Sequence, residues 1–201
     1  MSDNDPTPVC GLASTHRVTS ADITPQVPHF RSKFNIEEDI VSQSEASPQR
    51  STWTFLRPVA FYENLSNDFL GKGFIAMWRL NGLDRKLQMI STSDIGKIAA
   101  DAFINADQEE YCNRAISLAG DELSPNEAAQ IFKETTGQEI PWTYSIVGRS
   151  LRWLLREQLG LMFDWFVSAG FKADIPSLRK RYPFLKDFKT WLIEESAWKR
   201  D

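Results

Sequence analysis

The chain has 201 residues, of which 42% are hydrophobic and 25% are charged. These proportions are typical of a folded globular protein, and the length allows one to two domains. The 23 basic and 27 acidic residues give a formal net charge of −4, which disfavours nucleic acid and anionic membranes as partners. The most apolar stretch, residues 151–171, contains four charged residues, so no membrane-spanning helix is expected.

Cysteine and histidine are too sparse for a disulfide framework or a metal site. The two cysteines are Cys10 and Cys112, and neither histidine, His16 or His29, has a second ligand at metal-binding spacing. Cys112 is interpreted as a small, semi-buried residue. The first residues carry neither the basic nor the apolar region of a signal peptide. The expected location is therefore intracellular: the cytoplasm, with the nucleus as a further compartment.

The first half of the chain alternates between loop-like and regular patterns. Residues 1–28 contain four prolines among small polar residues, a composition typical of a loop or mobile arm. An amphipathic pattern predicts a helix over Ser32–Ser44. Strands are predicted at Trp53–Leu56, which a proline soon follows, and at Leu87–Ile90.

The second half continues this alternation. A helix is predicted over Asp94–Asn105 with Ser93 as its N-cap, and a strand over Arg114–Ala119. Further elements are a strand at 142–144 and helices at 149–169 and 186–198. Strands that alternate with helices, followed by a mainly helical last third, predict an α/β fold.

The clearest helix signal lies between residues 124 and 137. Ser124 is expected to be the N-cap, Pro125 occupies the first turn, and Glu127 has the spacing of a capping box. Gly137 is expected to end this helix after Thr136.

Two local patterns match the motifs of dehydrogenases only in part. The first is Gly71-Lys72-Gly73, the nearest approach to a dinucleotide fingerprint, but Ala76 replaces the third glycine and no strand precedes it. No phosphate-binding turn of that type is therefore expected. The absence of a P-loop leads to the same conclusion.

The second pattern concerns tyrosine, histidine and lysine spacing. Tyr182 and Lys186 have the Y-x3-K spacing in which a lysine lowers the pKa of a tyrosine, but Pro183 interrupts the helical turn. Tyr182 is therefore interpreted as a packing residue. His29 and Lys33 lie four residues apart at a helix start, and spacing alone favours a solvated helix face.

Four segments in order resemble the NmrA-like family of atypical short-chain dehydrogenases. They are VPHFRSKFNIEEDI, WTFLRPVAFYENL, STSDIGKIAADAFIN and ISLAGDELSPNEAAQIFKETTG, within a resemblance that covers about residues 22–195. The resemblance implies a Rossmann domain with a smaller C-terminal domain, and NADP or NAD in the cleft between them. It implies that Lys33 contacts the nicotinamide ribose, that His29 stands at the position of the catalytic tyrosine, and that the nicotinamide pocket is lined by Val59, Ala60, Phe61 and Tyr62.

The family pattern also has a glycine turn and about four strand–helix units before the P-H-F-x-S-K segment, which this chain reaches at residue 28. The expected fold is therefore α/β, a partial Rossmann-like domain with a smaller α+β, mainly helical C-terminal domain. The expected division is a flexible arm at 1–28, a Rossmann remnant at 29–66 and a substrate or interaction domain at 67–201. The strand near Trp53 should then be exposed, strained or covered by another segment.

These observations leave two functional hypotheses open. The first is an NADP-linked oxidoreductase, or a dinucleotide-sensing protein of that lineage, whose cofactor binding is weak because the first half of the Rossmann domain is missing. The second is a non-enzymatic regulatory or protein-interaction module. A partial product of a longer gene is a third interpretation. Apolar residues at 34–62 predict self-association or a protein partner.

Overall fold

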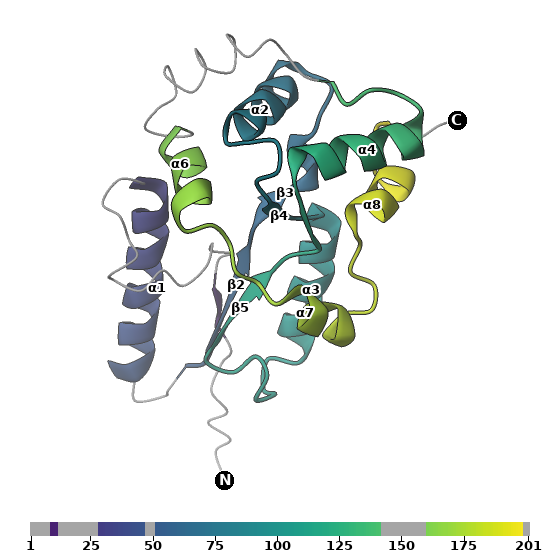
Figure 1. Cartoon of the computed structure of the whole chain (residues 1–201). Coiled ribbons are helices and arrows are strands. Elements are labelled where there is room, and N and C mark those ends of the chain that lie inside the picture. Colours follow the sequence, from purple (N-terminus) through teal and green to yellow (C-terminus); the bar gives the residue numbers. More distant parts are fainter. Residues whose placement is uncertain (1–8, 12–27, 47–50, 142–159, 199–201) are drawn as a thin grey trace.

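The computed structural model describes residues 9–11, 28–46, 51–141 and 160–198 (Figure 1). Three parallel strands form one sheet in the order β1 (Val9–Gly11), β2 (Trp53–Pro58) and β5 (Arg114–Leu118). A second sheet has the order β3 (Ala60–Phe61), β4 (Leu87–Ile90) and β6 (Asp121–Leu123), with β6 antiparallel to β4.

Two sheets and helices that alternate with their strands confirm the predicted α/β class. The helices of the described part are α1 (Pro28–Ala46), the short 3-10 helix η1 (Tyr62–Asn64), α2 (Phe69–Leu80), α3 (Thr92–Ile104), α4 (Pro125–Thr136), α6 (Leu161–Ser168), α7 (Ile175–Arg181) and α8 (Phe188–Glu194). The strand expected at 142–144 and the first part of the helix expected at 149–169 lie outside the described residues.

The local signals of α4 are confirmed in full. The Ser124 hydroxyl accepts a hydrogen bond from the Glu127 amide, and the Glu127 carboxylate accepts one from the Ser124 amide. Gly137 ends the helix with a φ of 73°, a conformation that glycine adopts without strain.

Two other helix starts differ from the prediction. The first helix begins at Pro28 rather than Ser32, because proline needs no hydrogen-bond partner in a first turn. The N-cap of α3 is Ser91 rather than Ser93, since Ser91 has the extended backbone and its hydroxyl accepts from the Ser93 amide.

The chain passes from one sheet to the other at two adjacent places. β2 continues through Val59 into β3, and β5 continues through Ala119 and Gly120 into β6. The Val59 amide donates to the Leu118 carbonyl at 3.1 Å, which joins the two crossings. A side chain at Gly120 would lie 2.4 Å from the Lys186 carbonyl oxygen, so only glycine fits there. We refer to this region as the sheet crossing.

The strand β2 is buried, so an exposed strand near Trp53 is wrong, and the alternative that another segment covers it is confirmed. Residues 9–11, inside the segment expected to be a loop or arm, form β1 instead and pair with one edge of β2, while β5 pairs with the other. Five of the six residues of β2 are buried. Among the large apolar side chains described at 34–62, Ile36 is the exposed one. Association through residues 34–62 stays a prediction.

Packing follows two buried clusters of apolar side chains. One lies around α2, α4, α6 and α8 and is rich in aromatic rings, and the other lies between the sheet crossing, α3 and α7. β5 comes from the part of the chain expected to form the C-terminal domain, yet it completes the sheet of β2. Along the described ranges, no helix combines the length and apolar character needed to cross a membrane.

Candidate functional site

The first two motif segments meet through a buried ion pair. Arg57 of β2 donates from Nε to Glu37 Oε1 of α1 at 3.1 Å, and its Nη2 donates to the other carboxylate oxygen. The side chains are only 5% and 8% exposed. Because a buried charge is costly without a partner, this pair fixes α1 against the carboxyl end of β2.

Lys33 lies on α1 one turn before Glu37 and is half-buried. Burial lowers the pKa of the Lys33 amine below its ordinary value, and the nearby Glu37 carboxylate opposes this only in part. A half-buried amine of this kind can donate hydrogen bonds to a hydroxyl-bearing ligand. His29 also belongs to α1, and its side chain lies outside the described residues.

Residues 59–62 lie at the sheet crossing. Val59, Ala60 and Tyr62 are buried, and Phe61 is half-buried. Ala60 and Phe61 pair with β4, while the Tyr62 hydroxyl lies 3.5 Å from the Lys186 carbonyl oxygen. Burial raises the pKa of the Tyr62 hydroxyl, so it stays protonated. In this structure, these residues therefore pair with β4 and pack in the protein interior.

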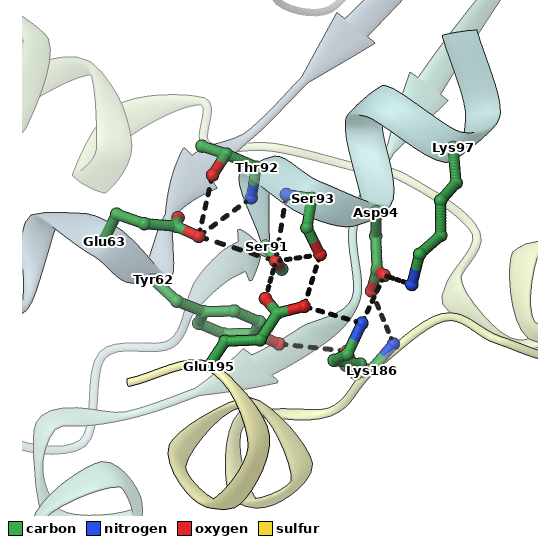
Figure 2. Close-up of polar contacts among 9 residues, drawn as sticks. All are labelled: Tyr62, Glu63, Ser91, Thr92, Ser93, Asp94, Lys97, Lys186 and Glu195. Atoms are coloured by element: carbon green, nitrogen blue, oxygen red, sulfur yellow. Dashed lines mark hydrogen bonds and ion pairs between the residues drawn. The ribbon is translucent and has the colours of Figure 1, made fainter. Parts of the chain in front are cut away.

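A polar network follows directly at the carboxyl ends of β3 and β4 (Figure 2). The Glu63 carboxylate accepts from the Thr92 amide at 3.0 Å and from the Thr92 hydroxyl at 2.9 Å. The hydroxyls of Ser91 and Ser93 both donate to Glu195, Ser91 at 2.6 Å. These contacts connect η1, the start of α3 and the segment after α8.

The centre of this network is the buried pair of Asp94 and Lys186. Lys186 Nζ lies 2.8 Å from Asp94 Oδ1 and 3.0 Å from Glu195 Oε1, and its amide donates to Asp94 Oδ2 at 2.8 Å. Asp94 is fully buried and the Lys186 side chain is 6% exposed. Lys97 lies 3.3 Å from the same aspartate. We call these residues, with Ser91, Ser93 and Glu195, the Lys186 network.

The ionisation of this network follows from these contacts. Burial acts to raise the pKa of Glu195, but hydrogen bonds from Ser91 and Ser93 and the Lys186 ammonium lower it to about 2. Burial acts to lower the pKa of Lys186, and the carboxylate contacts more than reverse this. The Glu195 carboxylate and the Lys186 ammonium are therefore both charged at neutral pH, and Lys186 contacts Asp94 as well.

The interpretation of Tyr182 as a packing residue is confirmed. Tyr182 is buried, it ends α7, and its hydroxyl lies 3.0 Å from the Tyr111 hydroxyl. Lys186, the lysine of the Y-x3-K pattern, contacts Asp94 and not the Tyr182 hydroxyl. The network was missed by spacing alone, although Asp94 belongs to the D-I-G motif.

The glycines of the rejected fingerprint lie in a helix. Gly71 and Gly73 belong to α2, and a side chain at Gly71 would lie 2.1 Å from the Ser66 carbonyl oxygen. The prediction that these glycines do not form a phosphate-binding turn before a helix agrees with their place inside α2. In the described segments, no three His, Cys, Asp or Glu side chains gather in a way that could hold a metal ion.

Four of the cavities among the described residues are well formed, and these four do not include Lys33 or residues 59–62 in their walls. The largest has a volume of about 580 Å³ and follows β5. Cys112 is partly exposed and has a free thiol, as expected for a small, semi-buried residue.

The comparisons agree with the resemblance carried by the four motifs. The model of the NmrA-like family matches residues 11–177. Among solved structures, an NADPH-dependent quinone oxidoreductase from Escherichia coli has 15% identity and a TM-score of 0.62, covering 91% of this chain and 65% of its own. The negative transcriptional regulator NmrA in complex with NADP has 14% identity and a TM-score of 0.58, with coverages of 94% and 64%.

A nucleoside-diphosphate-sugar epimerase from Staphylococcus aureus is similar at 14% identity and a TM-score of 0.59, covering 93% of this chain and 64% of its own. At such identities the likeness establishes the fold alone. The chain spans slightly less than two thirds of the length of these structures. No curated protein sequence matches it.

Proposed function

Because this chain belongs to the NmrA-like family, we propose that it is a dinucleotide-sensing regulator rather than an efficient reductase. The observation that carries this proposal is that the polar groups around the sheet crossing are buried and hydrogen-bonded within the protein. Tyr62, Asp94 and Lys186 are bonded to other protein groups and are buried. General acid–base catalysis needs a group that can exchange a proton with a bound substrate, and these groups are occupied.

Lys33 and the backbone at 59–62 are the residues that would hold the nicotinamide half of NADP. The half-buried Lys33 amine fits a ribose hydroxyl. A bound nicotinamide would supply hydride chemistry. In the described ranges no glycine turn is available for the pyrophosphate. The nicotinamide half is therefore expected to supply at most about 5.5 kcal/mol of binding free energy, which corresponds to a dissociation constant of about 100 μM or weaker.

An NADP-linked oxidoreductase of the atypical short-chain dehydrogenase type is the second candidate. The likeness to the NADPH-dependent quinone oxidoreductase favours it. In that case Lys33 would orient the nicotinamide ribose, and His29, at the family's tyrosine position, would be the candidate proton donor because imidazole titrates near neutral pH.

Two measurements separate these functions. Calorimetric titration with NADP should give weak binding that disappears in Lys33→Met, while Lys180→Met, an exposed lysine on α7, should bind like the wild type. NADPH with a quinone should show no turnover above background. A low-micromolar constant that is unchanged in Lys33→Met would refute the proposed contact. Steady NADPH oxidation that is lost in Lys33→Met would establish the oxidoreductase instead.

A further inference from the structure

Among the strands of the described residues, β5 is an edge of the parallel sheet. It pairs there with β2 alone, in continuous register over Arg114–Leu118. Arg114 and Ala115 are exposed, and Ile116 and Ser117 are half-exposed. Natural edge strands are usually protected from further pairing by charged residues, proline or bulges. The middle of β5, residues 115–117, has none of these.

A preformed groove of about 580 Å³ follows this edge. Its other walls are residues 172–174, the inner side of α7, and the pair Glu109 and Glu110 (Figure 1 shows α7 beside β5). Arg181 of α7 binds Glu110 at 2.7 Å. We call this space the β5 groove.

The wall at residues 172–174 is fixed as well. The Gln88 side chain of β4 donates to the Ala173 carbonyl at 3.0 Å and accepts from the Ala173 amide at 2.9 Å. The walls of the groove are therefore fixed by side-chain contacts at both ends.

We propose that β5 pairs with β5 of a second copy of this chain, antiparallel and about a two-fold axis at Ile116. Two identical edge strands can pair in this isologous way, because each supplies the same backbone donors and acceptors to the other. The two three-stranded sheets then form one sheet of six strands, close to the mean sheet size. In the described part of the chain the other edge strand is β1, with three residues.

The distribution of charge favours a second copy as the occupant. Glu109, 95% exposed, lies at the end of the groove where β5 begins, and binds Arg114 at 3.6 Å. Lys172 is exposed at the other end, next to Ala173, which shares a buried cluster with Leu118 at the end of β5. A two-fold axis reverses the groove and brings Lys172 of each copy toward Glu109 of the other, so opposite charges meet twice.

Disulfide crosslinking tests the position of the axis. A residue on the axis faces its own copy at a Cα separation of about 4.5–5.5 Å, which is within the range of a disulfide. In a background with Cys10 and Cys112 replaced by serine, Ile116→Cys should form a crosslinked dimer on oxidation with diamide. Ile193→Cys, 53% exposed on α8, is the matched control. Crosslinking of Ile116→Cys no faster than that of the control overturns the proposal.

Sedimentation equilibrium tests the association itself. We expect a reversible dimer of the 23.0 kDa chain with a dissociation constant on the order of 10 μM, as is usual for a small interface. Ala115→Lys places a charge opposite Ser117 of the other copy and should weaken the dimer by about tenfold or more. Ala100→Lys, exposed on α3, should not.

Circular dichroism shows whether each variant is folded, and Ala115 is exposed, so its substitution leaves the core intact. The proposal is overturned if the wild-type chain stays monomeric at about 100 μM. The same holds if a monomeric chain binds an unrelated extended peptide along β5. A dimer that Ala115→Lys leaves unchanged overturns it as well.

Discussion

Substitution of Lys186 by methionine should destabilise the protein strongly. The change removes the ammonium group that lies 2.8 Å from Asp94 and 3.0 Å from Glu195, while methionine keeps most of the side-chain volume. Asp94 is fully buried, and loss of one partner of a buried pair typically costs about 3–5 kcal/mol. Asp94 keeps the Lys186 amide and Lys97 as partners. We therefore expect a loss of about 3 kcal/mol, at the lower end of that range.

Urea unfolding followed by tryptophan fluorescence measures this loss. A decrease of about 3 kcal/mol should also lower the melting temperature by about 6–12 °C in a chain of this size. Lys189→Met, an exposed lysine on α8, is the matched control and should change stability by less than about 0.5 kcal/mol. A loss below about 1 kcal/mol in Lys186→Met, the range of exposed ion pairs, would show that the network is not a buried one.

The pH dependence of unfolding gives a second measurement. The pKa of Glu195 is lowered to about 2 in the folded protein, so its contribution is fully present above its ordinary pKa of about 4.3 and is lost as the pH falls toward 2. Because Glu195 is exposed, solvent screening keeps this contribution well below the limit of about 3 kcal/mol that the shift alone would give. Lys186→Met should flatten this acid limb, because Ser91 and Ser93 alone then hold the carboxylate. An unchanged acid limb would contradict the assigned role of Lys186.

Two further substitutions test other parts of the fold by the same unfolding measurement. Glu37→Gln leaves the buried Arg57 guanidinium without its ion-pair partner, and a loss of about 3 kcal/mol is expected; a change below about 1 kcal/mol would contradict this. Gly120→Ala should destabilise the protein because the added carbon would meet a backbone carbonyl at 2.4 Å, whereas Gly96→Ala, on α3 with nothing within 4 Å, should stabilise it by about 0.5–1 kcal/mol. Equal effects of the two glycine substitutions would refute the close approach at the sheet crossing.

Local signals explain which elements the sequence predicts well. α4 is predicted residue by residue because Ser124, Pro125, Glu127 and Gly137 act within one or two turns of the helix. β4 is predicted with its bounds because four consecutive residues are buried on both faces. The choice of Ser91 over Ser93 as the N-cap was missed because both side chains suit an N-cap, and only the backbone of Ser91 is extended.

Elements that depend on distant partners were missed. α2 contains Gly71 and Gly73, which disfavour a helix locally, yet Gly71 is required because Ser66 lies against it. β3 and β6 have only two and three residues and exist through pairing with β4. The contact of Asp94 with Lys186 joins residues 92 positions apart, and no periodicity in the sequence carries that information.

The pairing of β2 with β5 has a consequence for how the chain folds during synthesis. Thr54 pairs with Arg114, so the central strand cannot complete its sheet until about sixty later residues have left the ribosome. The contact of Asp94 with Lys186 forms later still, because 92 positions separate the two residues. Contacts between residues so distant in sequence form slowly, and in that interval the apolar face of β2 is open to solvent and Asp94 has Lys97 but not yet Lys186 as a cationic partner. We therefore expect nascent chains of intermediate length to be the species most dependent on chaperones.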